Sequence, residues 1–131
     1  MQSAIRSFTA GMVTMLLLTG CQQRERQPQP VPATQVEQLS AVLAGGYFLR
    51  QNCARTDIPD DVKLQRTAIH IAQQRGWDIH TPEYQQLPAR AQARYQALMQ
   101  DSTPMQDKCA ALNRSTARFV AAAQSEHDSV D

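Results

Sequence analysis

The 131-residue sequence contains few of the residues that typify several classes of fold and function. It has 5 Gly and 5% aromatic residues, which argues against an all-β domain with many turns and aromatic strands. Acidic and basic residues nearly balance, with a formal net charge of +1. Neither a basic nucleic-acid binder nor an acidic tail is therefore expected. The length and a hydrophobic content of 42% allow one small domain with a modest core.

The motifs of common catalytic and cofactor sites are also missing from the sequence. His70, His80 and His127 form no H-x-x-x-H pair, so a zinc site is not predicted. The sequence contains neither a Gly-rich phosphate loop nor a G-x-S-x-G nucleophile motif. We therefore expect no metal, no cofactor and no enzymatic activity.

No apolar run is long enough to cross a membrane, but the N-terminus has the features of a secretory signal. Arg6 precedes the apolar stretch 12–18 and two small residues, and that stretch is far shorter than the ~20 residues of a membrane-spanning helix. The motif LTGC at 18–21 resembles the bacterial lipobox, which predicts a signal peptide over 1–20 and lipidation of Cys21. The alternative is an ordinary secreted protein with an odd cysteine nearby. Gln22, rather than Asp, follows the cysteine, and by the lipoprotein sorting rule this indicates the outer membrane.

Only two cysteines remain once Cys21 is assigned to lipid. Cys53 and Cys109 would enter an oxidising compartment, which favours one disulfide over the alternative of two free buried thiols. On the chain-entropy model, a bridge that closes a loop of this size contributes roughly 4 kcal/mol.

The segment 21–33 is predicted to be a lipidated, disordered tether. Pro28, Pro30 and Pro32 alternate with polar or small residues and exclude a helix or a central strand. At ~3.1 Å per residue, residues 22–33 would reach at most about 35–40 Å from the membrane.

Residues 34–125 are predicted to form an all-α, four-helix domain, followed by a frayed tail over 126–131. A capping-box pattern at Thr34 starts a helix over 35–52. Pro59 opens a second helix that ends at Gly76, with Ala72 and Trp77 in position for a Schellman contact. A short helical piece after Pro82 and a helix over 88–101 follow. The last helix starts at 103–104 and continues to about residue 123.

The first helix has an apolar arc of about 160°, wider than the ~100° that one buried face needs. The bridge fixes Cys53 inward, so the centre of the arc must be buried, and one edge is expected to line a groove for an amphipathic partner helix. The edge residues are the candidate partner-binding residues: Val36, Leu43 and Tyr47 on one side, and Val42 and Leu49 on the other. The edge with Leu43 and Tyr47 is the preferred one. Gly45 and Gly46 within the same helix indicate a close approach of another backbone, or a bend.

Several segments resemble the PulS/OutS-type pilotins of type II secretion. The similar stretches are GYFLRQNCARTDIP at 46–59, QRGW at 74–77, YQAL at 95–98, STP at 102–104 and KCAALNR at 108–114, continuing to Phe119. Each motif alone is weak, but together with the lipobox they occur in matching order over most of the chain after residue 20. The tether is not similar.

The resemblance implies a small outer-membrane lipoprotein with a four-helix fold and one disulfide. Such pilotins bind the C-terminal segment of secretin subunits, protect it and carry it to the outer membrane, where the secretin assembles into its pore. That segment becomes helical on binding. Two alternatives are a lipoprotein subunit of another envelope assembly and a periplasmic inhibitor of a hydrolase. An inhibitor would present a protruding polar loop, whereas a pilotin needs an apolar groove.

Overall fold

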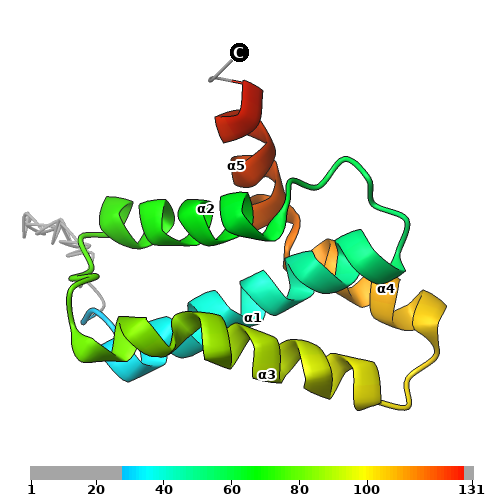
Figure 1. Cartoon of the computed structure of the whole chain (residues 1–131), viewed down its shortest axis with the longest axis horizontal. Helices are drawn as coiled ribbons and strands as arrows, with labels where there is room; N and C mark the ends of the chain where they lie inside the picture. Colours follow the sequence, from blue (N-terminus) through cyan, green and yellow to red (C-terminus); the bar gives the residue numbers. More distant parts are fainter. Residues whose placement is uncertain (1–27, 129–131) are drawn as a thin grey trace, which may run out of the picture.

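The computed structural model describes residues 28–128, and within this range all the secondary structure is helical (Figure 1). This confirms the predicted all-α class. None of the helices in this range has the combined length and apolar content of a membrane span. The elements are α1 (Pro32–Asn52), α2 (Asp61–Gln74), the 3-10 helix η1 (Pro82–Gln86), α3 (Leu87–Gln100), α4 (Met105–Ser115) and α5 (Ala117–Asp128).

The long helix α1 is the centre of the domain, and it packs against α2, α3 and α4 (Figure 1). Its buried residues are not confined to one stripe. Phe48 is fully buried, although it lies outside the apolar arc of the helix. The ring of Tyr95 on α3 lies 6.3 Å from the ring of Phe48, so α3 covers the face of α1 that the sequence pattern left polar.

The start of α1 differs from the prediction. The helix begins at Pro32, with Val31 as the N-cap and without a side-chain cap, so the capping box at Thr34 does not form. Proline suits the first helical position because its missing N–H would have no partner there. The side-chain amide of Gln35 donates to the carbonyl of Pro30 at 2.7 Å. Residues 32–33, predicted to be part of the tether, are thus helical.

Both ends of α2 are determined by local sequence. The carboxylate of Asp60 accepts a hydrogen bond from the N–H of Lys63 at 2.9 Å, which satisfies one of the free donors of the first turn. At the other end Gly76 has φ +74°. The N–H of Trp77 donates to the carbonyl of Ala72 at 3.0 Å, which is the bond of a Schellman ending. The predicted stop at Gly76 is confirmed, but the helix starts at Asp61 and not at Pro59 as predicted, because Asp60 caps it.

The structure also confirms the predicted short helical piece and the main helix after it. The short piece is η1, and α3 begins at Leu87 with Pro88 in its first turn. Proline is tolerated at this position but not further inside a helix.

The predicted last helix is divided in two at Thr116. This residue has φ −107° and ends α4, and its hydroxyl donates to the carbonyl of Leu112 at 2.6 Å. A side-chain bond of this kind competes with the helical pattern. The break directs α5 away from α4 and against α2 (Figure 1). Because α5 continues to Asp128, residues 126–128 are helical and not part of a frayed tail.

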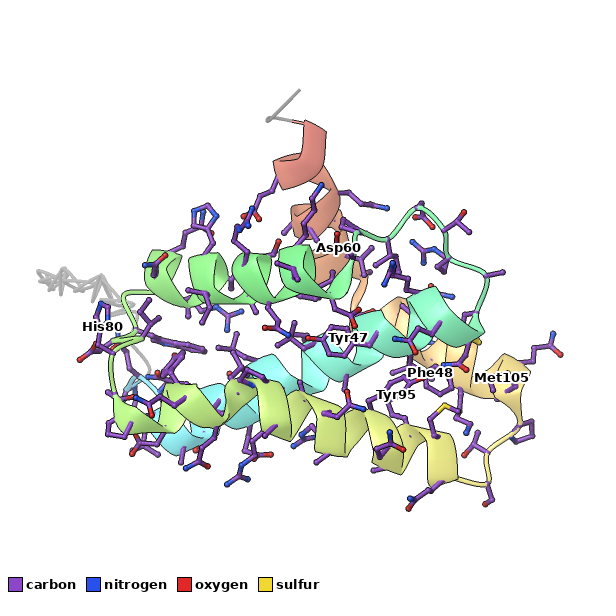
Figure 2. All side chains as sticks on the ribbon, in the orientation of Figure 1. Tyr47, Phe48, Asp60, His80, Tyr95 and Met105 are labelled. Carbon is purple, nitrogen blue, oxygen red and sulfur yellow. A yellow bond between two sulfur atoms is a disulfide. The ribbon has the colours of Figure 1, made fainter. Side chains whose placement is uncertain are left out.

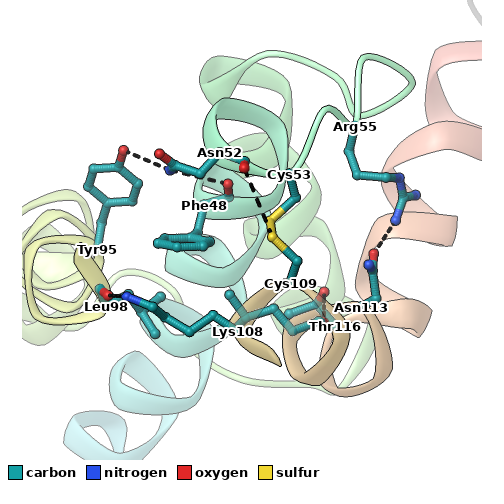
Figure 3. Close-up of a disulfide and its surroundings, with 11 residues drawn as sticks. Phe48, Asn52, Cys53, Arg55, Tyr95, Leu98, Lys108, Cys109, Asn113 and Thr116 are labelled. Carbon is teal, nitrogen blue, oxygen red and sulfur yellow. Dashed lines mark hydrogen bonds between the residues drawn. A yellow bond between two sulfur atoms is a disulfide. The ribbon is translucent and has the colours of Figure 1, made fainter. Parts of the chain in front are cut away.

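The disulfide between Cys53 and Cys109 is present, as predicted, with a Cα–Cα distance of 5.7 Å. It joins the C-terminal end of α1 to α4 (Figure 3).

Beside the disulfide, the buried ammonium of Lys108 donates to the carbonyls of Leu98 and Asp101 at 2.8 and 2.7 Å. It also lies 5.5 Å from the centre of the Phe48 ring. Lys108 thus gives a partner to one of the last carbonyls of α3 and to the carbonyl of its C-cap residue.

The glycine pair in α1 permits a close approach of neighbouring side chains. A Cβ on Gly45 would lie 2.5 Å from Cγ2 of Thr116, and one on Gly46 would lie 3.3 Å from a methyl group of Leu64. The atoms that come close are those of side chains and not, as was predicted, of another backbone, and α1 meets the junction of α4 and α5 at Gly45.

Candidate functional site

A groove with an apolar floor lies where α1, α2 and the start of α5 meet. Its volume is about 320 Å³, at the lower end of the range for ligand pockets. Leu39 and Phe119 are buried at its base, while Val42 and Ile71 are partly exposed. Its four remaining lining residues are polar and exposed: Gln38, Arg75, Ser115 and Arg118.

The five candidate partner-binding residues of α1 do not all lie at this groove. Val42 lines it. Val36, Leu43, Tyr47 and Leu49 are between 0% and 4% exposed and belong to the core of the domain. The preferred edge, with Leu43 and Tyr47, is therefore not an open surface in this structure. The open edge of α1 is the one with Val42.

Packing by α2 and α3 explains why the preferred edge is closed. Figure 2 shows Tyr47 between α2 and α3, and the side-chain amide of Gln65 on α2 donates to the Tyr47 hydroxyl at 3.1 Å. Burial raises the pKa of this phenol above its usual value, more than the hydrogen bond lowers it. Tyr47 therefore stays neutral and acts as a packed, hydrogen-bonded core residue.

Most of the groove comes from residues that the sequence did not single out. Ile71 lies on α2 and Phe119 on α5, and neither was a candidate partner-binding residue. Arg75 and Arg118 carried no signal at all, because their proximity depends on the break at Thr116.

Contacts between α2 and α5 keep the α5 side of the groove in place. The carboxylate of Glu126 accepts a hydrogen bond from the Thr67 hydroxyl at 2.7 Å and contacts Nδ1 of His70 at 2.5 Å. Burial opposes ionisation of Glu126, but these two partners hold its pKa below the usual value. The carboxylate is therefore ionised at neutral pH and links α5 to α2.

The site is suited to binding rather than to chemistry. Its lining residues offer an apolar floor and guanidinium groups but no nucleophile paired with a base. Between residues 28 and 128, no group of three or more His, Cys, Asp or Glu could hold a metal ion. The predicted signal peptide and the lipidation residue Cys21 lie outside the described residues.

Comparison with known proteins identifies the family. The model of the type II secretion system pilotin lipoproteins (PulS_OutS) matches residues 18–121. The chain belongs to this pilotin family. The match begins at the first residue of the LTGC motif.

Two curated relatives support the assignment. The chain is 37% identical over 116 residues to pilotin OutS of Dickeya dadantii (strain 3937), which covers 82% of this chain and 86% of the relative. It is 38% identical over 112 residues to the pullulanase secretion protein PulS of Klebsiella pneumoniae, covering 83% and 88% of the two chains.

Solved structures of pilotins have the same fold. A chain from a pilotin/secretin peptide complex superimposes with a TM-score of 0.68 at 36% identity, covering 73% of this chain and 98% of that one. A chain from the Klebsiella pneumoniae type II secretion system outer membrane complex, which contains PulD, PulS and the PulC HR domain, gives a TM-score of 0.64 at 38% identity. It covers 69% of this chain and 95% of that one.

Proposed function

We propose that this pilotin binds the C-terminal segment of its secretin in the groove between α1, α2 and α5, and delivers the secretin to the outer membrane. The observation that carries the proposal is an apolar groove in a pilotin-family domain. A related pilotin has been solved as a complex with a secretin peptide. The protein acts by binding alone and is not an enzyme.

The dimensions of the groove fit one face of an amphipathic helix. Its volume of about 320 Å³ accommodates a few apolar side chains rather than a whole helix, so the rest of a docked helix would stay exposed. A segment that folds on docking loses about 2–5 kcal/mol to ordering. Burial of roughly 80–200 Å² of apolar surface offsets that cost. The exposed parts of Val42 and Ile71 supply surface of this kind.

Val42→Asp and Ile71→Asp test the groove. Each change places a carboxylate against the apolar face of the partner, so secretin binding should fall at least tenfold while the fold is kept. Isothermal titration with a synthetic peptide of the secretin C-terminal segment measures binding, and circular dichroism measures the melting temperature.

Two matched variants make this test decisive. Val62 lies on α2, is 66% exposed and is not part of the groove, so Val62→Asp should bind the peptide normally. Leu43 is fully buried, and Leu43→Asp should unfold the domain. Normal binding by both Val42→Asp and Ile71→Asp would show that the secretin docks elsewhere.

The proposed route to the outer membrane is the lipid on Cys21. In this scheme residues 1–20 are a signal peptide, residue 21 carries the acyl chains, and the tether leads to the periplasmic domain. Cys21→Ser should leave secretin binding intact but prevent the secretin from reaching the outer membrane. Membrane fractionation and labelling with palmitate measure the two effects. Equal labelling of Cys21→Ser and wild type would contradict the assignment.

A further inference from the structure

The rim of the groove carries positive charge, which binding to the apolar floor alone does not require. Arg75 and Arg118 are its only charged lining residues, and both are exposed. The groove therefore presents two positive charges beside an apolar surface, with no acid among its lining residues to balance them.

Among the other described arginines, four have acidic partners (Arg50, Arg55, Arg90 and Arg94), whereas Arg66 and Arg114 form no ion pair. Arg90 and Arg94 both bind Glu37, whose pKa is lowered by the hydrogen bond from Arg94 and by the charges of both arginines. Arg55 binds Asp57 through two hydrogen bonds of 2.8 Å. In these pairs an acid of the same chain balances the charge of the arginine, which is not the case for the two groove arginines.

The groove arginines have no such partner in the part of the chain that the structure describes. The Arg75 guanidinium lies over the ring of Trp77, 4.8 Å from its centre, and makes no ion pair. No hydrogen bond or ion pair joins the side chain of Arg118 to the described residues. Arg118 also belongs to the first turn of α5, which contains no acidic residue.

We propose that the groove selects a partner helix with carboxylates flanking its apolar face, one beside Arg118 and one beside Arg75. This proposal rests on the proposed function and deepens it by specifying the chemistry of the bound secretin segment. The apolar side chains fill the floor, while the flanking Asp or Glu residues fix the rotation of the helix in the groove. Charge complementarity of this kind chiefly determines specificity and association rate.

Arg118→Gln and Arg75→Gln test the proposal with the secretin C-terminal peptide as the probe. An exposed ion pair changes Kd by up to about fivefold, so each variant should bind two- to fivefold more weakly and show a smaller dependence on salt. Arg66→Gln removes the same charge from an exposed site on α2 outside the groove and should bind normally. Arg75→Lys, which keeps the charge over Trp77, should also bind nearly normally.

A second peptide, combined with these variants, completes a double-mutant cycle. In it, every Asp and Glu of the secretin segment is replaced with Asn or Gln. It should bind wild type more weakly, and Arg118→Gln should cause no further loss with this peptide. A peptide with Lys at those positions should bind the Arg118→Glu protein more tightly than it binds the wild-type protein. These non-additive results would show that the carboxylates of the peptide interact with the groove arginines.

The possible outcomes separate this inference from the proposed function. If wild type binds the secretin peptide and all arginine variants bind it equally well, the charge inference is overturned and the proposed function stands. A secretin segment without acidic residues beside its apolar face that binds tightly also overturns the inference. If wild type does not bind the peptide at all, the proposed function fails as well. Melting temperatures of each variant within a few degrees of wild type confirm that folding is not the cause.

Discussion

The two halves of α1 have different neighbours. Around its C-terminal half, the ring of Phe48 is fully buried, the Cys53–Cys109 disulfide ties α1 to α4, and Lys108 bonds carbonyls at the end of α3 (Figure 3). We call this region the disulfide end. Around the N-terminal half, Val42 stays partly exposed at the groove, and we call this region the groove end.

This difference indicates a division of roles along one helix. At the disulfide end, apolar atoms are covered and buried polar groups have partners, so that region contributes stability. At the groove end, apolar surface and two positive charges are left without partners within the described residues. Surface of that kind is costly to expose and is typical of an interaction site. The disulfide end therefore holds in place the helices that form the groove end.

The largest effect is expected from Phe48→Ala, which removes the ring between Tyr95 and Lys108. Truncation of a buried phenylalanine costs about 3–5 kcal/mol of unfolding free energy, through lost burial and the remaining cavity. Urea unfolding followed by circular dichroism measures it. The exposed change Val62→Ala should alter stability by less than about 0.5 kcal/mol. A Phe48→Ala cost below about 1 kcal/mol would refute a stabilising role for the disulfide end.

Loss of the disulfide comes next. Cys53→Ser with Cys109→Ser should lower the free energy of unfolding by about 2–4 kcal/mol, because the reduced unfolded chain gains freedom. Residual structure in that chain reduces the effect. Secretin-peptide affinity should change little where the double variant remains folded, since neither cysteine lines the groove. Equal loss of affinity and stability would show that the two ends of α1 are not independent.

Gly45→Ala probes the junction between the two ends. Alanine favours helix by up to about 1 kcal/mol over glycine, but its Cβ would lie 2.5 Å from Cγ2 of the buried Thr116. We expect a net destabilisation of about 1–3 kcal/mol from overpacking, measured by thermal melting. Thr116→Ser removes that methyl group and keeps the hydroxyl that bonds Leu112. It should therefore rescue Gly45→Ala. If Thr116→Ser does not restore the stability of Gly45→Ala, the overpacking does not come from the Thr116 methyl group.

The smallest effect concerns pH. Hydrogen bonds from Arg55, and then from Gln124 of α5, lower the pKa of Asp57 to about 2. A lowered folded-state pKa stabilises the fold above the unfolded value of 3.8, and this contribution is lost as the pH falls towards 2. Because the side chain is 50% exposed, the effect should be below about 1 kcal/mol. Urea unfolding between pH 2 and 6 should show a difference from Asp57→Asn that vanishes at the acid end. A constant difference would contradict it.

Much of the fold could be predicted because its signals are local. Gly76 ends α2 because a left-handed residue is needed there and glycine adopts that conformation freely. Pro82 and Pro88 mark helix starts because proline is tolerated only in the first turn. The disulfide followed from two cysteines left over in an oxidising compartment. None of these conclusions required knowledge of which helices are neighbours.

The sequence predicted that a groove lies beside α1, but not which edge of the helix lines it. Periodicity showed that α1 has more apolar surface than one face requires, and that surplus is real. It could not show which edge stays open, because the answer depends on α3 covering Phe48 and on α2 reaching Tyr47. Arg118 reaches the groove only through the break at Thr116.

The sequence by itself therefore determined the all-helical class, the helices other than the break at Thr116, some of their ends, the disulfide and the family. Those features depend on neighbouring residues, on cysteine number, or on motifs in matching order. The tertiary structure decided which face of α1 is covered and which arginines meet at the groove. Such contacts arise between residues far apart in the chain, and a helix that is apolar on most sides does not by itself specify its neighbours.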